Sequence, residues 1–301
     1  LDQRLNRLVP GGFRRTFVDR YERLHELENR IAASVGLDRM PASVSAYDAE
    51  NLMHSKVQEQ IVQFEEKYIK SIADKMREAG LDAEQVGLYL LAKHAPERNR
   101  VIAAREREMR QEQIDRLNKA LEDSMGALDR PSEEIVARLD RLENEPLKFQ
   151  ETGSGMTDAD AESVIAKAKQ EDKYDTLEAI AADVYTMLSD MRENMVAKGL
   201  LDDDTREDWE DTYEFYVPLK GFAAVETDGQ MQAGSAKGFT IKGKESFRAK
   251  GRITLPANPL LNAFKDGETK IIRAERNVIA QRLLKMLSKF KSDQWSVYPP
   301  T

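Results

Sequence analysis

The sequence has no cysteine, few glycines and prolines, and no long apolar run. Without cysteine the chain can form neither a disulfide framework nor a cysteine-ligated zinc site. Glycine fills 16 positions, proline 10, and aromatic residues make up 7% of the 301 residues, which argues against a strand-rich fold with many tight turns. No stretch approaches the roughly 18 consecutive apolar residues of a transmembrane helix. These absences favour a mainly α protein built from long, solvated helices.

The charge balance is acidic overall but basic in one region. Charged residues make up 33% of the chain and the net charge is −8, which argues against wholesale wrapping of nucleic acid. Between Lys220 and Arg252 a Gly-rich stretch carries seven basic against three acidic residues. This stretch is either a solvated loop or a sequence-nonspecific contact for an anionic partner such as the DNA backbone. The basic residues that would make such a contact are Lys237, Lys242, Lys244, Arg248, Lys250 and Arg252.

Apolar residues recur at helical spacing along most of the chain. We expect long amphipathic helices in an extended bundle, with a short extended segment and the Gly-rich loop near residues 216–252. Pro96 is expected to begin a new helix, Thr157 to cap another, and Gly36, Gly80 and Gly199 to end three of them. The helices are predicted over about 13–35, 49–79, 83–93, 96 to beyond 125, 132–145, 157–169, 177–198 and 259–290.

The turn-forming stretch FQETGSGM, residues 149–156, predicts a soft boundary near residue 150. The expected division is an N-terminal helical region, 1–150, and a C-terminal helical region with the basic loop, 151–301. The chain begins without Met and ends at QWSVYPPT, so we also expect it to be a fragment of a longer polypeptide.

Known catalytic and metal-binding patterns do not fit. His25 begins an HExxH-like string, but Asn29 stands where the second zinc ligand would be. The acidic run that begins at Asp158 resembles a calcium loop, yet Ser163 replaces the required glycine and Lys169 the bidentate glutamate. No G-x-S-x-G nucleophile elbow occurs. The sequence therefore predicts no catalytic, cofactor-binding or metal-binding residue.

A short polar string is repeated in two predicted helices. Glu-Arg-Asn followed by an apolar run occurs at residues 97–99, after His94, and again at residues 275–277. The repeat is either a coincidence or a sign that two helices form a buried polar junction. The candidate interaction residues are His94, Glu97, Arg98, Asn99, Glu275, Arg276 and Asn277.

Six strings together resemble segments of the very large polyvalent, or internal virion (ejection), proteins of tailed bacteriophages. They lie in the same order as in that family, between Leu88 and Leu287, and none is a mechanistic signature. The strings are AKHAPERN, GSGMTDADAE, YEFYVPLKGF, FRAKGR, NPLLNAF and IIRAERNVIAQRLL.

The resemblance implies a structural segment that is packaged in the virion, enters the host cell with the genome, and acts in particle assembly or DNA delivery. The alternative is a non-catalytic region of a virion-carried enzyme, such as an RNA polymerase or an antirestriction polyprotein. The partners implied are portal, tail or further ejection proteins and further copies of the chain, and no cofactor is expected.

Overall fold

The computed structural model describes residues 22–128, 133–220 and 251–290, and these are mainly helical, so the predicted fold class is confirmed. Within these ranges there is no strand, and the β-type pairing is limited to one isolated bridge between Ser154 and Arg252. In chain order the elements are α3 (Glu22–Ser34), α4 (Ala46–Phe64), the π-helix η1 (Glu65–Ile69), α5 (Lys70–Glu78), α6 (Ala83–Leu128), α7 (Glu133–Asn144), α8 (Asp158–Gln170), α9 (Tyr174–Ala197), α10 (Asp203–Thr212) and α12 (Pro259–Lys289).

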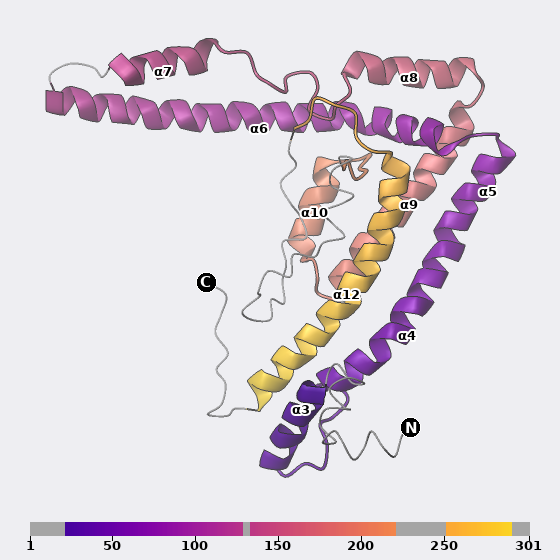
Figure 1. Ribbon diagram of the computed structural model, residues 1–301. Helices are drawn as coiled ribbons and strands as arrows, with labels where there is room; N and C mark the ends of the chain where they lie inside the picture. The colour runs from indigo at the N-terminus through magenta and orange to yellow at the C-terminus, as the bar shows by residue number, and fades with distance from the viewer. Residues whose placement is uncertain (1–21, 129–132, 221–250, 291–301) are drawn as a thin grey trace, which may run out of the picture.

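Helix α6 runs across the whole molecule in Figure 1, and the other helices are arranged around it. Helices α4, α5, α9 and α12 extend away from the half of α6 where it begins, and α8 lies along the opposite side of that half. Helix α7 lies along the half of α6 that ends at Leu128. At 46 residues, α6 spans about 70 Å.

The predicted helix over residues 49–79 is present as one continuous rod of α4, η1 and α5. Ser45 caps its start by accepting a hydrogen bond from the backbone N–H of Asp48, and Gly80 follows its end at φ 62°. The π-helical turn in the middle begins directly after Phe64, which packs against Gly267 of α12. A Cβ on Gly267 of α12 would lie 2.2 Å from the Phe64 ring, so this approach requires glycine.

Other helix ends also lie where the sequence predicts them. Thr157 caps α8 through the backbone N–H of Asp160, and Gly199 follows α9 at φ 64°. Asn258 caps α12, with Pro259 in the first turn, and its side-chain amide also donates to the carbonyl of Ala83 at 2.7 Å. This last contact fixes the start of α12 against the start of α6.

The predicted break at Pro96 is wrong, because α6 continues through it. A proline inside a helix removes one backbone hydrogen bond and disfavours helical geometry in the preceding residue, at a cost of about 3 kcal/mol. Here Ala92, His94 and Ala95 are fully buried on the turns before Pro96, and Asn99 is buried just after it. Tertiary burial on both sides of Pro96 therefore keeps the helix intact.

The acidic stretch at residues 203–212 forms helix α10, which the apolar spacing did not predict. The helix begins because the Asp202 side chain caps the N–H of Thr205, and its first turn carries Asp203 and Asp204 near the positive end of the helix dipole. Residues 213–220, which include the start of the extended segment predicted near residue 216, contain a turn at residues 214–215 and otherwise have no regular secondary structure. The rest of that segment and the Gly-rich loop, residues 221–250, lie outside the described residues.

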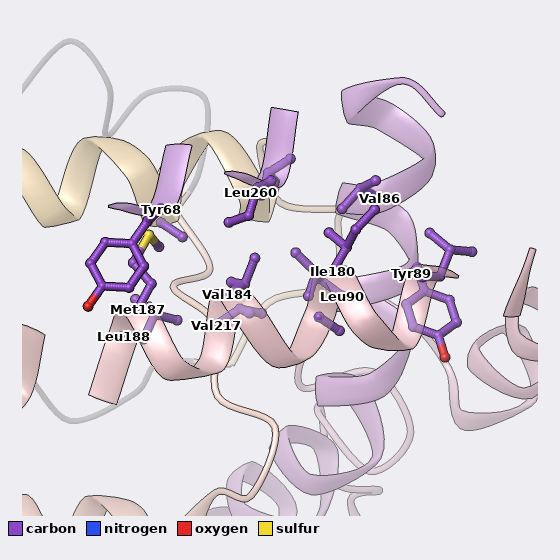
Figure 2. Packing of buried hydrophobic residues seen from close by; sticks show 14 of the residues in the cluster. Tyr68, Val86, Tyr89, Leu90, Ile180, Val184, Met187, Leu188, Val217 and Leu260 are labelled. Atoms are coloured by element: carbon purple, nitrogen blue, oxygen red, sulfur yellow. The ribbon is translucent and has the colours of Figure 1, made fainter. Parts of the chain in front are cut away.

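The largest core lies where α6, α9, the α4–α5 rod and the start of α12 meet, as Figure 2 shows. A second core joins α3 and the first half of α4 to the last turns of α12, through residues such as Ile31, Met53 and Met286. Two smaller clusters lie between α6 and α8 and between α9 and α12. The residues labelled in Figure 2 are Tyr68, Val86, Tyr89, Leu90, Ile180, Val184, Met187, Leu188, Val217 and Leu260.

Helices from the two predicted regions pack on each other. Helix α12 lies along α4, and the Gln60 side-chain amide donates to the Glu275 carboxylate at 2.8 Å. The division near residue 150 stays a prediction. No helix among the described residues has both the length and the apolar character needed to cross a membrane.

Candidate functional site: a buried polar junction on helix α6

The predicted interaction residues of α6 meet Arg252 in one buried polar junction. We define the α6 junction as residues 94–99 of α6 together with the segments 153–157, 213–220 and 251–254 that pack against them. His94 is fully buried, Arg98 and Asn99 are nearly so, and the carboxylate of Glu97 is largely covered. The other predicted basic residues, Lys237, Lys242, Lys244, Arg248 and Lys250, lie outside the described residues.

Glu97 holds the backbone of the segment that follows α10. Its two carboxylate oxygens accept hydrogen bonds from the N–H groups of Glu214 and Phe215, each at 3.1 Å. Burial raises the pKa of the Glu97 carboxyl, but its neighbour His94 and these two N–H groups outweigh burial, so the pKa lies below its ordinary value. Glu97 is therefore ionised at neutral pH and binds this segment through charge-assisted hydrogen bonds.

Asn99 holds a second segment, the turn before α8. Its side-chain oxygen accepts from the N–H of Ser154 at 2.7 Å, and its amide nitrogen donates to the Met156 carbonyl at 2.9 Å and to an Asp158 carboxylate oxygen at 2.7 Å. Ser154 is fully buried, and a Cβ on Gly153 would lie 2.7 Å from Ile102. The stretch that was predicted as a turn or linker is thus fixed tightly to α6.

Arg252 ties the third segment to the other two. Its backbone N–H donates to the Gly153 carbonyl at 3.1 Å, and its guanidinium donates to the carbonyls of Lys220 at 3.1 Å and Thr254 at 2.9 Å. Burial, and then the nearby charge of Arg98, lower the pKa of the Arg252 guanidinium. Lys220 in turn pairs with the Asp266 carboxylate of α12 at 2.5 Å. The described residues on either side of residues 221–250 are therefore in direct contact.

His94 lies inside an aromatic cage. Its ring makes edge contacts with Tyr213 and Tyr216, at centroid distances of 5.2 and 5.7 Å, and Tyr216 in turn meets Trp209 of α10 at 4.8 Å. The carboxylate of Glu97 lies 3.9 Å from Nδ1, too far for a hydrogen bond. Neither ring nitrogen has a hydrogen-bond partner within the part of the chain that is described. Burial is the main cause that lowers the His94 pKa, so the ring is neutral at neutral pH.

The repeated string on α12 makes a separate set of contacts. The Glu275 carboxylate is buried and pairs with Lys198 at 2.7 Å, and the side-chain amide of Asn277 donates to the Lys198 carbonyl at 2.9 Å. Arg276 is exposed. The glutamate and asparagine of the α12 string thus hold the end of α9, whereas those of the α6 string hold residues 154–158 and 213–215.

The polar side chains of the junction hold chain segments together. Its carboxylate and amide groups bind backbone atoms, and within the described ranges no group of three or more histidines and carboxylates could hold a metal ion. A hollow of about 400 Å³ lies elsewhere, between the first turns of α6 and α12, and is lined mostly by apolar residues such as Leu88, Leu255 and Leu261.

No family model, curated protein or solved structure matches the chain.

Sequence reasoning missed the partners of these residues. Tyr213 and Tyr216, which enclose His94, and Ser154, which binds Asn99, belong to strings that were singled out but were not connected with α6. The available signal was composition. YEFYVPLKGF and GSGMTDADAE both contain turn-forming glycine or proline, and both also contain large apolar residues, many in the first and Met156 in the second, which a fully solvated loop would not need. Which segment contacts which helix is a property of the fold and has no local signal.

Proposed function

We propose that this chain is a structural segment of an internal virion protein of a tailed bacteriophage, which enters the host cell with the genome and acts in particle assembly or DNA delivery. One observation carries the proposal. Four of the six strings that resemble this family are far apart in the sequence, yet residues from each of them meet at the α6 junction. Strings shared for an architectural reason are expected to converge in this way.

The other two strings, NPLLNAF and IIRAERNVIAQRLL, lie on α12, with Asn258 as its cap. Their polar residues hold α12 against α6 and the end of α9, through Asn258, Glu275 and Asn277. This use of the strings for holding helices together supports an architectural role over a catalytic one. In the proposed virion the partners are portal, tail or other ejection proteins and further copies of the chain.

Quantitative peptide mass spectrometry on purified, nuclease-treated particles of the phage that encodes this chain tests the proposal. We expect peptides from both halves of the chain at several copies per particle. A capsid protein provides the copy-number standard, and an early intracellular phage protein provides the background level. Peptides at that background level would contradict the proposal and favour a protein made and used inside the cell after infection.

We also propose that the basic stretch contacts DNA without sequence preference. The supporting observation is the local excess of Lys and Arg, on a chain whose net charge is −8, next to a junction that holds Lys220 and Arg252 together. Since Arg252 binds backbone carbonyls, the contact would depend on Lys237, Lys242, Lys244, Arg248 and Lys250.

Fluorescence anisotropy with a labelled duplex at several salt concentrations measures this contact. We expect affinity to fall steeply with salt, with a slope on logarithmic axes of up to about 4 to 5 for five phosphate contacts. Replacing the five residues by Gln should abolish binding, whereas Arg107→Gln on the exposed face of α6 is the matched control. Binding that is absent, or independent of salt, would exclude this role.

A further inference from the structure

The buried His94 is a titratable group that the architectural role of the junction does not require. Its side chain is fully buried between Tyr213 and Tyr216, and neither ring nitrogen has a hydrogen-bond partner among the residues described. A buried polar group without a partner is costly, and an apolar or aromatic side chain would fill the same space without this penalty. Such a group is a candidate for a function other than packing.

The charged and titratable groups around His94 come from four elements. On α6 they are Glu97, at 3.9 Å from Nδ1, and Arg98, whose charge opposes protonation of the ring. The segment after α10 contributes Tyr213 and Tyr216. Behind these lie Tyr185 of α9 and Asp266 of α12. Burial chiefly raises the pKa values of Tyr185 and Tyr216, and the negative charges of Glu97 and Asp266, respectively, raise them further. Glu97 is therefore the single carboxylate next to the ring within the described residues.

Glu97 cannot serve a protonated His94 and its present partners equally well. Its oxygen Oε2, the atom nearest the imidazole, is also the acceptor for the N–H of Phe215, while Oε1 accepts from Glu214. A protonated ring gains a second N–H donor and a positive charge in a buried site, so it must find an acceptor nearby. Closing the 3.9 Å gap to a hydrogen bond requires the carboxylate or the ring to shift, and a shift of the carboxylate disturbs its two bonds to the backbone.

We propose that His94 is a proton-operated latch: uptake of one proton by its ring draws Glu97 from the backbone N–H groups of Glu214 and Phe215 and releases residues 213–220 from α6. The only covalent change in this step is the N–H bond that the imidazole forms with a proton taken from solvent, and the proton remains on the ring. The release would also separate Phe215 from Lys93, which lies 4.2 Å over its ring, and Tyr216 from Trp209. The proposed latch does not depend on the function proposed above.

The direction of the pH dependence follows from the two states of the ring. In the closed state burial chiefly, and Arg98 in addition, lower the pKa of His94, and the opposing effect of Glu97 is smaller than that of burial. In the open state the ring reaches water, and its pKa returns towards about 6.5. As the pH falls below about 6.5, the open state binds a proton that the closed state does not, so opening is favoured by up to about tenfold per pH unit.

Hydrogen exchange of the Glu214 and Phe215 amides, corrected for the intrinsic rate at each pH, tests the latch. Between pH 7.5 and 5.5 we expect their protection factors to fall by up to about tenfold, the limit that the linkage above sets. Amides in the middle of α12, such as that of Ile271, should keep their protection and so distinguish local release from global unfolding. In a Trp295→Phe background the fluorescence of Trp209 should change over the same pH range, because its contact with Tyr216 is lost.

Variants at His94 give the decisive comparison. His94→Phe, which suits the aromatic cage, and His94→Gln, which is polar and uncharged at every pH used, should both remove the fall in protection. His25→Gln and His54→Gln change the other two histidines and should leave it intact. The latch is wrong if the wild-type protection is flat from pH 7.5 to 5.5, or if the fall persists in a folded His94 variant.

If neither His94 variant folds, the wild-type protein still decides the question. The His94 ring-proton resonance must then titrate over the same pH range in which the Phe215 amide loses protection. A His94 that stays neutral while this amide becomes exposed would overturn the latch. Titration of Glu97 itself cannot mimic the result, because its pKa lies below the ordinary value near 4.5, well under the pH range used.

Discussion

The two halves of α6 form one continuous helix but are stabilised in different ways. In residues 83–103 about every second side chain is buried, and the fully covered residues include Leu90 and His94. In residues 104–123 no side chain is buried, and Met109 is 55% exposed. The first half is helical because it fills two cores, whereas the second depends on local pairs such as Arg116 with Glu112 and on contacts with α7.

Each half of α6 also contains a glutamate that holds a connecting segment in the same way. Glu97 in the first half and Glu106 in the second each accept hydrogen bonds from two successive backbone N–H groups, those of residues 214–215 and 148–149. Glu28 of α3 does the same for Ala46 and Tyr47 at the start of α4. The fold thus repeatedly uses a helix glutamate to hold a connecting segment, and it does so twice on α6, where both glutamates are half-buried.

The largest difference between the halves should appear on deleting apolar side chains. Leu90→Ala leaves a cavity in the main core and should lower the free energy of unfolding by about 2 to 5 kcal/mol. Met109→Ala removes an exposed side chain and should change it by less than about 0.5 kcal/mol. Urea unfolding followed by circular dichroism measures both.

A large cost for Met109→Ala, comparable to that of Leu90→Ala, would break the comparison. If that cost grew with protein concentration, the second half of α6 would be buried in an assembly of several chains. A concentration-independent cost would instead mean that the exposed half packs on residues of its own chain.

The next largest effect should come from the amide groups. Asn99→Ala leaves the buried N–H of Ser154 without its side-chain partner and removes one of the two side-chain hydrogen bonds to the Met156 carbonyl, so we expect a loss of about 1 to 3 kcal/mol. Gln113→Ala on the exposed half is the matched control and should be nearly neutral. Increased protease cleavage near residue 154 in the Asn99 variant would report the released segment directly. Equal stability of the two variants would show that the junction does not depend on Asn99.

The paired glutamates give a smaller, better-matched test. Glu97→Gln and Glu106→Gln each turn an acceptor oxygen into an N–H₂ group that opposes a backbone donor. We expect a loss of about 1 to 2 kcal/mol for Glu97, which lies among buried residues of the junction, and of less than about 1 kcal/mol for Glu106, on the half of α6 that buries no side chain. Unfolding free energies at pH 7 and pH 4 check this.

The pH dependence of this pair has a definite sign. Because the pKa of Glu97 is lowered in the folded state, its contribution is present above its ordinary pKa and is lost as the pH falls through the folded value. The difference between wild type and Glu97→Gln should therefore shrink on going from pH 7 to strongly acidic solution. A difference that grows on acidification would contradict the assigned hydrogen bonds.

Sequence reasoning succeeded where the determining interactions are local. The fold class, the cap at Thr157 and the glycines after α3, α5 and α9 were predicted, because each depends on a few neighbouring residues. The polar string at residues 94–99 was also singled out, although its partners were not. Residues 153–157 and 213–216 reach it only through the fold, at sequence separations of more than 50 residues.

The two errors have different origins. Helix α10 was missed because it is strongly acidic and Trp209 is its only large apolar residue, and it forms through its Asp202 cap and ion pairs such as Arg206 with Glu210. The break at Pro96 was predicted from local backbone chemistry, which burial of the surrounding turns overrides. Local rules fail here where tertiary packing is strongest, in the first half of α6.

Pro96→Ala is the smallest of these effects and tests that explanation directly. If burial alone keeps the helix intact, the proline still costs local stability, since it removes a backbone hydrogen bond and crowds the preceding turn, a penalty of about 3 kcal/mol in an isolated helix. Alanine would recover part of this but would make the unfolded chain more flexible, which offsets about 0.4 to 1 kcal/mol. We expect a net gain of about 1 kcal/mol in the free energy of unfolding, measured with urea, because the partly buried proline ring also loses contacts. A strongly destabilised Pro96→Ala would mean that residue 96 is held by a specific contact of the proline ring and not by the burial of its neighbours.

Gln113→Pro is the contrasting variant. Residue 113 has no core around it, so the proline should melt the second half of α6, which would appear as lost helical signal. A Gln113→Pro variant that keeps its full helical signal would contradict the contrast between the two halves of α6.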